Sequence, residues 1–247
     1  MAAIVLVPGF WFGAWAWEEI TPRLRAAGHD VYPVTLAGVA ERAVGGGRGV
    51  NVDTHIADLT GLIGSRGLRD VTLVGHSGAN MAVTGAADRM PSLVSRVVYV
   101  DSGPMPSGMA SIEFQGPEAQ RALRDLVAEQ GDGWLIPVPP FDPAADPVNL
   151  AGLTAEQLAV MRRRGTPQPL GTATQPLKRP DPRPAVPASA IATTFTPDQV
   201  RAMADGGNPI FAEMAGIDLH HLPTGHWPMF SRPADLADLL GKLAADR

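Results

Sequence analysis

The chain of 247 residues contains no cysteine, and only two of its 20 basic residues, Lys178 and Lys242, are lysines. Without thiols there is no disulfide framework, no thiolate metal site and no cysteine nucleophile. The net charge of -5 argues against a nucleic-acid or anionic-membrane partner. No Asp/Glu/His spacing indicates a metal site, and no glycine-rich dinucleotide fingerprint follows a strand. We therefore expect no metal and no cofactor.

Long apolar runs are absent as well. The uncharged N-terminal stretch holds a run of only six apolar residues, at 2–7, which Pro8 and Gly9 end. Such a run is too short to span a membrane, and it lacks the positively charged start of a signal peptide. We expect a cytoplasmic protein with no membrane partner, and the sequence leaves a homodimer open.

What the sequence does contain is an alternation of short β-branched runs with helical patterns. Strands are predicted at 4–7, 31–36, 71–75, 96–100, 190–195 and 217–222, and helices at 15–27, 53–63, 78–90, 117–130, 154–164, 197–204 and 233–245. Strands that alternate with helices imply an α/β fold, with a mostly parallel sheet and helices on both faces.

Prolines interrupt this alternation. Fifteen of the 24 prolines fall between residues 102 and 189. Because proline fixes φ and lacks an N–H, this stretch should consist of short helices and ordered loops. We predict a core made of residues 1–101 and 190–247, with a proline-rich cap inserted at 102–189.

The strongest functional signal is a predicted strand that runs into Gly75-His76-Ser77-Gly78-Ala79 and then into a helix. In a nucleophile elbow, a serine stands on a tight strand-to-helix turn, and small residues two positions before and after it let the two backbones approach. Gly75 and Ala79 occupy those positions. A serine that merely caps the helix is the alternative interpretation, and we predict Ser77 as a nucleophile.

The serine needs a base, and in this kind of elbow the histidine comes last in the chain. His220 and His221 lie in or at the end of a predicted strand. His226 follows in a loop at the carboxyl edge of the sheet, from which a base can reach the serine. We predict His226 as the base, and the backbone N–H groups of Phe10 and Gly78 as the oxyanion donors.

These residues resemble the α/β-hydrolase superfamily. Within it, they are similar to the branch that holds plant methyl-ketone and methyl-ester esterases, hydroxynitrile lyases and bacterial pyrethroid-hydrolase-like esterases. The matching segments are 5–9, 13–17, 26–31, 73–78, 166–170 and 225–226. The resemblance implies an α/β-hydrolase fold, a small-molecule ester as substrate, and a cap over the active site where the prolines gather.

Two departures from the branch bear on the reaction. Pro8 replaces the usual histidine before the oxyanion glycine, and the backbone donor survives that change. The hydroxynitrile lyases have a threonine in the oxyanion turn and a lysine after the catalytic histidine, where this chain has Gly9 and Trp227. Since the lysine stabilises departing cyanide, the lyase interpretation loses its main support.

Two aspartates are candidates for the acid that orients the histidine. In plant members of the branch the acid follows the strand that matches 190–195, where Asp198 is the only carboxylate, but Asp198 also suits the first turn of a helix. Asp101 ends the strand at 96–100, a place where some α/β-hydrolases have their acid. We predict Asp101 and keep Asp198 as the alternative.

Aromatic and apolar residues beside the motifs predict an apolar pocket, with Trp134 as the aromatic residue of the cap. The candidates are Trp11, Phe12, His76, Trp134, Trp227, Met229 and Phe230. We predict a serine hydrolase that cleaves a small-to-medium apolar carboxylic ester through an acyl-enzyme. Lyase-like or cofactor-free oxygenase chemistry, and a non-catalytic ligand-binding protein, are the alternatives.

Overall fold

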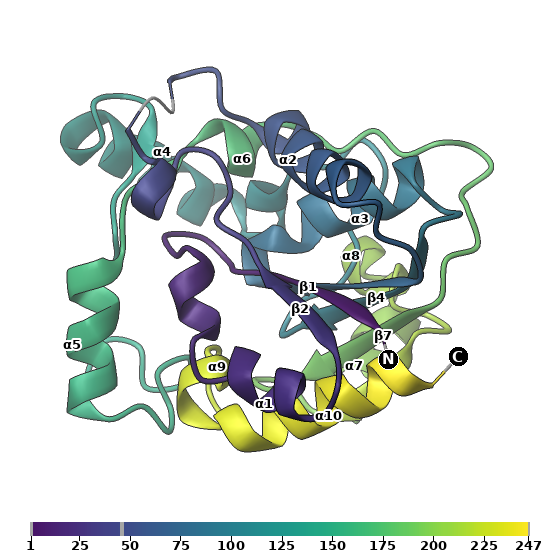
Figure 1. The fold of residues 1–247 in the computed structure, drawn as a ribbon. Coiled ribbons are helices and arrows are strands. Elements are labelled where there is room, and N and C mark those ends of the chain that lie inside the picture. Colours follow the sequence, from purple (N-terminus) through teal and green to yellow (C-terminus); the bar gives the residue numbers. More distant parts are fainter. Residues whose placement is uncertain (1, 45–46, 247) are drawn as a thin grey trace.

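The computed structural model describes residues 2–44 and 47–246. Within these ranges, six strands form a parallel sheet in the order β2-β1-β3-β4-β7-β8 (Figure 1). They are β1 (Ala3–Val7), β2 (Asp30–Pro33), β3 (Val71–His76), β4 (Val94–Val100), β7 (Ala188–Ala192) and β8 (Asp218–His221). The predicted α/β fold with a parallel sheet is confirmed.

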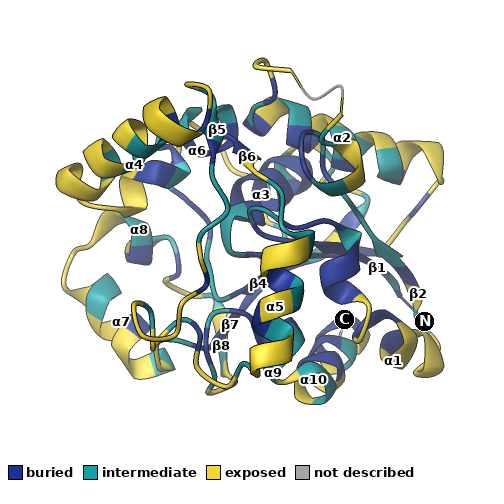
Figure 2. Cartoon of the chain, turned by 90° about the vertical axis from the view of Figure 1, so that its left-hand side faces the viewer, coloured by how far each residue is buried: buried dark blue, intermediate teal, exposed yellow. Residues whose placement is uncertain are grey.

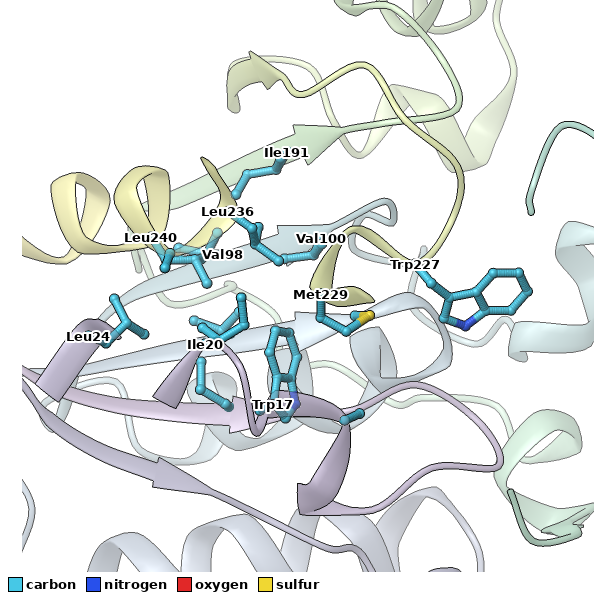
Figure 3. Close-up of a cluster of buried hydrophobic side chains, with 14 of the residues drawn as sticks. Trp17, Ile20, Leu24, Val98, Val100, Ile191, Trp227, Met229, Leu236 and Leu240 are labelled. Atoms are coloured by element: carbon cyan, nitrogen blue, oxygen red, sulfur yellow. The ribbon is translucent and has the colours of Figure 1, made fainter. Parts of the chain in front are cut away.

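Helices cover both faces of this sheet, and side chains of β1 alternate between them. Ile4 and Leu6 belong to one buried cluster, which includes residues of α1 (Thr21–Ala26) and α10 (Pro233–Ala245). Val5 and Val7 belong to the other, with α2 (Val52–Ser65) and α3 (Asn80–Arg89). Figure 3 shows Leu24 of α1 beside the α10 leucines, against the strands. Both faces of the sheet are therefore apolar and covered by helices, as is usual for parallel sheets.

Some predicted elements end earlier in the structure than their sequence patterns. The helix expected at 15–27 is divided into a 3₁₀ helix, η1 (Ala14–Trp17), and α1, which begins beside Pro22. The strand expected at 31–36 ends with β2 at Pro33, although the N–H of Val34 still donates to the carbonyl of Leu6 at 3.0 Å. The strand expected at 190–195 ends with β7 at Ala192, since the next two N–H groups bond to a carboxylate instead of a strand.

The segment between β4 and β7 carries several short elements and two longer helices. They are η4 (Ser111–Phe114), α4 (Pro117–Gln130), β5 (Leu135–Ile136), α5 (Ala155–Arg164), β6 (Gln168–Pro169) and α6 (Gly171–Thr174). α4 and α5 lie within one residue of their predicted bounds and present exposed faces in Figure 2. The antiparallel pair β5–β6 was not predicted, because strands of two residues have no detectable period.

The remaining elements are short, except for α7. They are η2 (Ala40–Arg42), η3 (Ser77–Ala79), α7 (Pro197–Asp205), α8 (Pro209–Ala212) and α9 (Pro228–Ser231). No helix among residues 2–44 and 47–246 is long and apolar enough to cross a membrane. In a parallel sheet all strands end at one edge, so the turns after β1, β3, β4, β7 and β8 meet there.

Candidate active site

Ser77 stands on the turn between β3 and α3 in a conformation that side-chain-bearing residues rarely adopt. Its φ of 49° lies in the left-handed region, where a residue other than glycine is held by its surroundings. A Cβ on Gly75 would lie 2.6 Å from a methyl group of Val83, so glycine lets β3 and α3 pack closely. Ala79 is buried in the same turn. The local geometry is that of a nucleophile elbow.

His226 lies in the loop between β8 and α9, and all four of its polar groups are bonded. Its Nε2 is 2.8 Å from Ser77 Oγ, and its Nδ1 is 2.6 Å from Asp101 Oδ2. Its backbone N–H donates to the carbonyl of Asn149 at 2.7 Å, and its own carbonyl lies 2.7 Å from Nε2 of His76. Three segments that are far apart in the sequence therefore hold His226 by its ring and its backbone.

His76 is the buried partner in this arrangement. Burial lowers the pKa of His76 to about 3, and the neighbouring charge of His226 acts in the same direction, against the hydrogen bond to the carbonyl. The ring is neutral at physiological pH, so Nε2 carries the proton and donates to the carbonyl of His226. The ring centroids of the two histidines lie 4.8 Å apart. His76 thus supports the loop that carries His226.

Asp101 follows β4 with a φ of 43°, which turns its buried carboxylate toward the sheet edge. Oδ1 accepts the N–H of Thr193 at 2.9 Å and of Thr194 at 3.0 Å, and Oδ2 accepts Nδ1–H of His226. Burial acts to raise the pKa of Asp101. The hydrogen bond and charge of His226, with the two threonine N–H groups, outweigh burial and hold that pKa well below its usual range. The group is therefore a carboxylate at physiological pH.

The alternative acid, Asp198, lies elsewhere. It stands in the first turn of α7, its side chain is 93% exposed, and it pairs with Arg201 at 2.8 Å. Thr196 and Gln199 form a capping box at the same helix end. Asp198 therefore belongs to the helix start, where its charge suits the helix dipole. The structure brings Asp101, and not Asp198, to the imidazole.

The turns after β1 and β3 approach each other closely beside the serine. A Cβ on Gly78 would overlap the ring of Phe10. A Cβ on Gly9 would lie 2.7 Å from Nδ1 of His76 and 3.0 Å from Cβ of Ser77. Phe10 and Gly78 both line the cavity at Ser77. Two glycines thus allow the residues predicted as oxyanion donors to lie side by side, which a two-donor oxyanion site needs.

A cavity of about 790 Å³ opens at Ser77, within the range of small-molecule sites. The segment between β4 and β7 supplies much of its wall, including Met105, Phe114 and Phe141. Phe195, from the turn after β7, lines it as well. The wall is mostly apolar, with the serine, the imidazole and the carboxylate at one place on it. This combination is typical of a small-molecule site.

Two of the predicted pocket residues belong to this wall. Trp11 follows the β1 turn with a φ of 70°, and Trp227 directly follows His226. Figure 3 shows the indole of Trp227 pointing away from Leu236 and Leu240. Phe141 packs edge-on against both tryptophans, with ring centroids 6.3 and 5.4 Å apart. The three rings form one aromatic end of the cavity.

The other predicted pocket residues lie away from the wall, and this corrects the expectation. His76 is buried because its ring turns to the carbonyl of His226. Trp134 lies in the turn before β5, where its carbonyl accepts the N–H of Leu170, and this holds it with the β5–β6 pair. Three further candidates belong to the core or pack against it: Phe12, Met229 and Phe230.

The part of the wall that comes from α7, α8 and the turn after α8 was not predicted. Val200, Phe211 and Met214 line the cavity there. A signal for α8 exists, because Asn208 followed by Pro209 is a helix start, and the Asn208 side chain does accept the N–H of Phe211. Four residues are too few to show a helical period, so α8 was not predicted. Among the residues with described positions, no cluster of three or more His, Cys, Asp or Glu side chains is arranged to hold a metal ion.

Residues 4–239 match the alpha/beta hydrolase family. The chain belongs to this family. Carbendazim hydrolyzing esterase of Nocardioides sp. (strain SG-4G) is 31% identical over 264 residues, which cover 98% of this chain and all of that protein. Methylesterase 7 of Arabidopsis thaliana is 35% identical over 98 residues, which cover 39% of this chain and 38% of the plant protein. With named esterases among its relatives, this alpha/beta hydrolase is a carboxylic ester hydrolase.

A solved structure extends the likeness to the whole fold. An extracellular alpha/beta-hydrolase from a Paenibacillus species superposes with a TM-score of 0.81, covering 98% of both chains at 19% identity. At this identity the likeness shows the fold alone. The alpha/beta hydrolase scaffold, including the segment between β4 and β7, is therefore shared along nearly its full length.

Proposed function

We propose that this alpha/beta hydrolase cleaves a small-to-medium apolar carboxylic ester through Ser77, His226 and Asp101. The observation that carries the proposal is the continuous hydrogen-bonded chain at the cavity wall. Ser77 Oγ lies 2.8 Å from His226 Nε2, and His226 Nδ1 lies 2.6 Å from Asp101 Oδ2. Nucleophile, base and orienting acid are the three parts of serine-dependent acyl transfer.

In the proposed reaction, His226 Nε2 takes the proton of the Ser77 hydroxyl as the oxygen attacks the ester carbonyl. The N–H groups of Phe10 and Gly78 stabilise the oxyanion that forms. Collapse of the tetrahedral intermediate breaks the ester bond, and the leaving alcohol takes the proton from His226. Water, deprotonated by the same nitrogen, then attacks the acyl-enzyme. The second tetrahedral intermediate collapses, Ser77 Oγ leaves and takes the proton back from His226, and the carboxylic acid is released. Asp101 stabilises the imidazolium in both halves without itself becoming protonated.

The apolar substrate is supported by the cavity wall. Its aromatic end holds Trp11, Phe141 and Trp227, and its other apolar part holds Phe211 and Met214. We propose residues 102–189 as the cap that covers the substrate, because this segment supplies a large share of the wall. The Nocardioides relative is named for carbendazim hydrolysis, so carbendazim belongs in the substrate panel beside methyl and aryl esters.

The test of this function is hydrolysis of p-nitrophenyl butyrate by Ser77→Ala and by a matched control, Ser65→Ala, at the exposed end of α2. Loss of the nucleophile should lower kcat by about a thousandfold or more, since only binding and the oxyanion donors remain. Ser65→Ala should hydrolyse the ester like the parent chain. Turnover retained by Ser77→Ala, measured as nitrophenolate release, would refute the proposal.

A further inference from the structure

The hydroxyl of Thr194 touches both oxygens of the proposed acid. Its Oγ1 lies 3.1 Å from Oδ1 of Asp101 and 3.0 Å from Oδ2. Oδ1 also accepts the backbone N–H groups of Thr193 and Thr194, whereas Oδ2 receives Nδ1–H of His226. Thr194 is therefore in contact with the oxygen that holds the base and with the oxygen that faces the backbone.

Pairing of β4 with β7 places these groups together. Val100 pairs with Ile191, and the N–H of Asp101 donates to the carbonyl of Ile191 at 2.8 Å. β7 ends at Ala192, so the next two N–H groups are free to turn toward the carboxylate. The Asp101 side chain is only 6% exposed, and a buried carboxylate needs donors in place of water. The turn after β7 supplies them.

The backbone N–H groups of Thr193 and Thr194 fix one oxygen of the carboxylate but not the position of the other. Both donate to Oδ1, so a pivot of the carboxylate about Oδ1, through combined rotation of the two side-chain torsions, can keep these hydrogen bonds while moving Oδ2 away from His226. The Thr194 hydroxyl lies at nearly equal distance from both oxygens and opposes that rotation. A donor in this place fixes the plane of the carboxylate as well as its position.

We propose that Thr194 is a positioning residue for the acid: its hydroxyl holds the Asp101 carboxylate in the plane where Oδ2 receives Nδ1–H of His226. The proposal rests on the proposed function, in which Asp101 orients the base. Without the hydroxyl, Oδ2 turns away from Nδ1 and stabilises the imidazolium form of His226 less.

Charged and titratable groups around His226 come from three elements. Asp101 faces it from the end of β4, and Ser77 and His76 face it from the end of β3. From the inserted segment, the Asn149 carbonyl holds its N–H, and the side chain of Asn149 is bonded to Asp146. His76 stays neutral above pH 4, with its pKa lowered to about 3. A change in the pH profile of a Thr194 variant therefore reports on the contact between Asp101 and His226.

The experiment compares Thr194→Val, which keeps the shape and removes the hydroxyl, with Thr194→Ser, which keeps the hydroxyl. Thr193→Val is the matched comparison, because the neighbouring Thr193 hydroxyl is buried with no hydrogen-bond partner among the described residues. All are assayed with p-nitrophenyl butyrate as full chains across pH 5–9. Thr194→Ala is a second hydroxyl-free variant for the case in which valine does not fold.

Thr194→Val should lower kcat by about tenfold and change KM by less than about twofold, because a charge-assisted hydrogen bond is lost without loss of substrate contacts. The acidic limb of kcat/KM should move to lower pH, because Oδ2 turned away from Nδ1 stabilises the imidazolium less. Thr194→Ser should stay within about twofold of the parent chain, and the fall in kcat of Thr194→Val should exceed that of Thr193→Val by about fivefold or more.

An unchanged kcat and pH profile in Thr194→Val, or an equal loss in Thr194→Ser, would overturn the role of Thr194. The Ser77→Ala variant distinguishes failure of the proposed function from failure of the role of Thr194. If Ser77→Ala keeps its activity, the proposed function is wrong; if Ser77→Ala is inactive and Thr194→Val is normal, only the role of Thr194 is wrong.

Discussion

Nε2 of His76 donates a hydrogen bond of 2.7 Å to the backbone carbonyl of His226, which lies 150 residues further along the chain. The residue before the proposed nucleophile thus holds the loop of the proposed base. Because the ring is fully buried and neutral, protonation of His76 would place a charge inside the core. The same contact that supports the site also makes the fold sensitive to acid.

The free energy of unfolding should therefore decrease as the pH is lowered through a window set by His76. Its pKa is lowered from 6.5 to about 3 in the folded chain, so the unfolded chain binds the proton first as the pH falls. The contribution of neutral His76 is fully present above pH 6.5 and is lost progressively toward pH 3. Between pH 6.5 and 5.0 the loss should be about 2 kcal/mol at most, which urea unfolding monitored by fluorescence would measure.

The variant that isolates this effect is His76→Phe, which cannot take up the proton. Its free energy of unfolding should be lower at neutral pH, because the carbonyl of His226 loses its donor. It should also fall less between pH 6.5 and 5.0 than that of the parent chain. The exposed His221 provides the control, and His221→Phe should keep the parent slope. An equal slope in His76→Phe would show that another group causes the acid sensitivity.

The two candidate acids make a matched pair of substitutions. Asp101→Asn keeps the size of the side chain but removes the charge that stabilises the imidazolium, so kcat for p-nitrophenyl butyrate should fall by about a thousandfold or more. Asp198→Asn changes an exposed group on α7 and should leave kcat near that of the parent chain. The reverse pattern, a normal Asp101→Asn and an impaired Asp198→Asn, would show that the acid is Asp198 and not Asp101.

Substitution of Gly78 tests whether the N–H groups of Phe10 and Gly78 stabilise the oxyanion. In Gly78→Ala the new methyl group overlaps the Phe10 ring, so it should push the two turns apart and misplace both N–H groups. Loss of aligned donors should lower kcat by about a hundredfold. Gly61→Ala, in α2 with nothing within 4 Å of the added methyl group, is the control and should keep full activity. A Gly78→Ala enzyme with parent kinetics would argue against an oxyanion site between Phe10 and Gly78.

Periodicity and turn chemistry predict most of the fold. The longer elements, such as α4 and α10, have the bounds that their patterns indicate, because a helical period extends over three turns in each. α10 buries its apolar face, whereas in α4 only Val127 is buried. Elements of two to four residues, such as β5 and α8, were missed because they follow from tertiary contacts. The end of β7 is another such case, since two N–H groups leave the ladder for the carboxylate of Asp101.

The candidate site divides in the same way. Chain order and the elbow motif pointed to Ser77 and His226, which the structure places in contact. Both aspartates fitted the acid by sequence position, with Asp101 preferred and Asp198 as the alternative, and the structure brings Asp101 to the imidazole. Pocket residues were the least predictable, because being next to a motif does not say which side of the backbone a side chain takes, as His76 demonstrates.

The central claim is that Ser77 is the nucleophile of this alpha/beta hydrolase, and covalent labelling by a fluorophosphonate tests it most directly. The reagent should react once per chain, with the adduct located on Ser77 by peptide mass spectrometry, and activity should disappear in proportion to labelling. An ester substrate should slow the reaction, and Ser77→Ala should not react. An active chain that takes no label, or one that loses activity with the adduct on another residue, would contradict the claim.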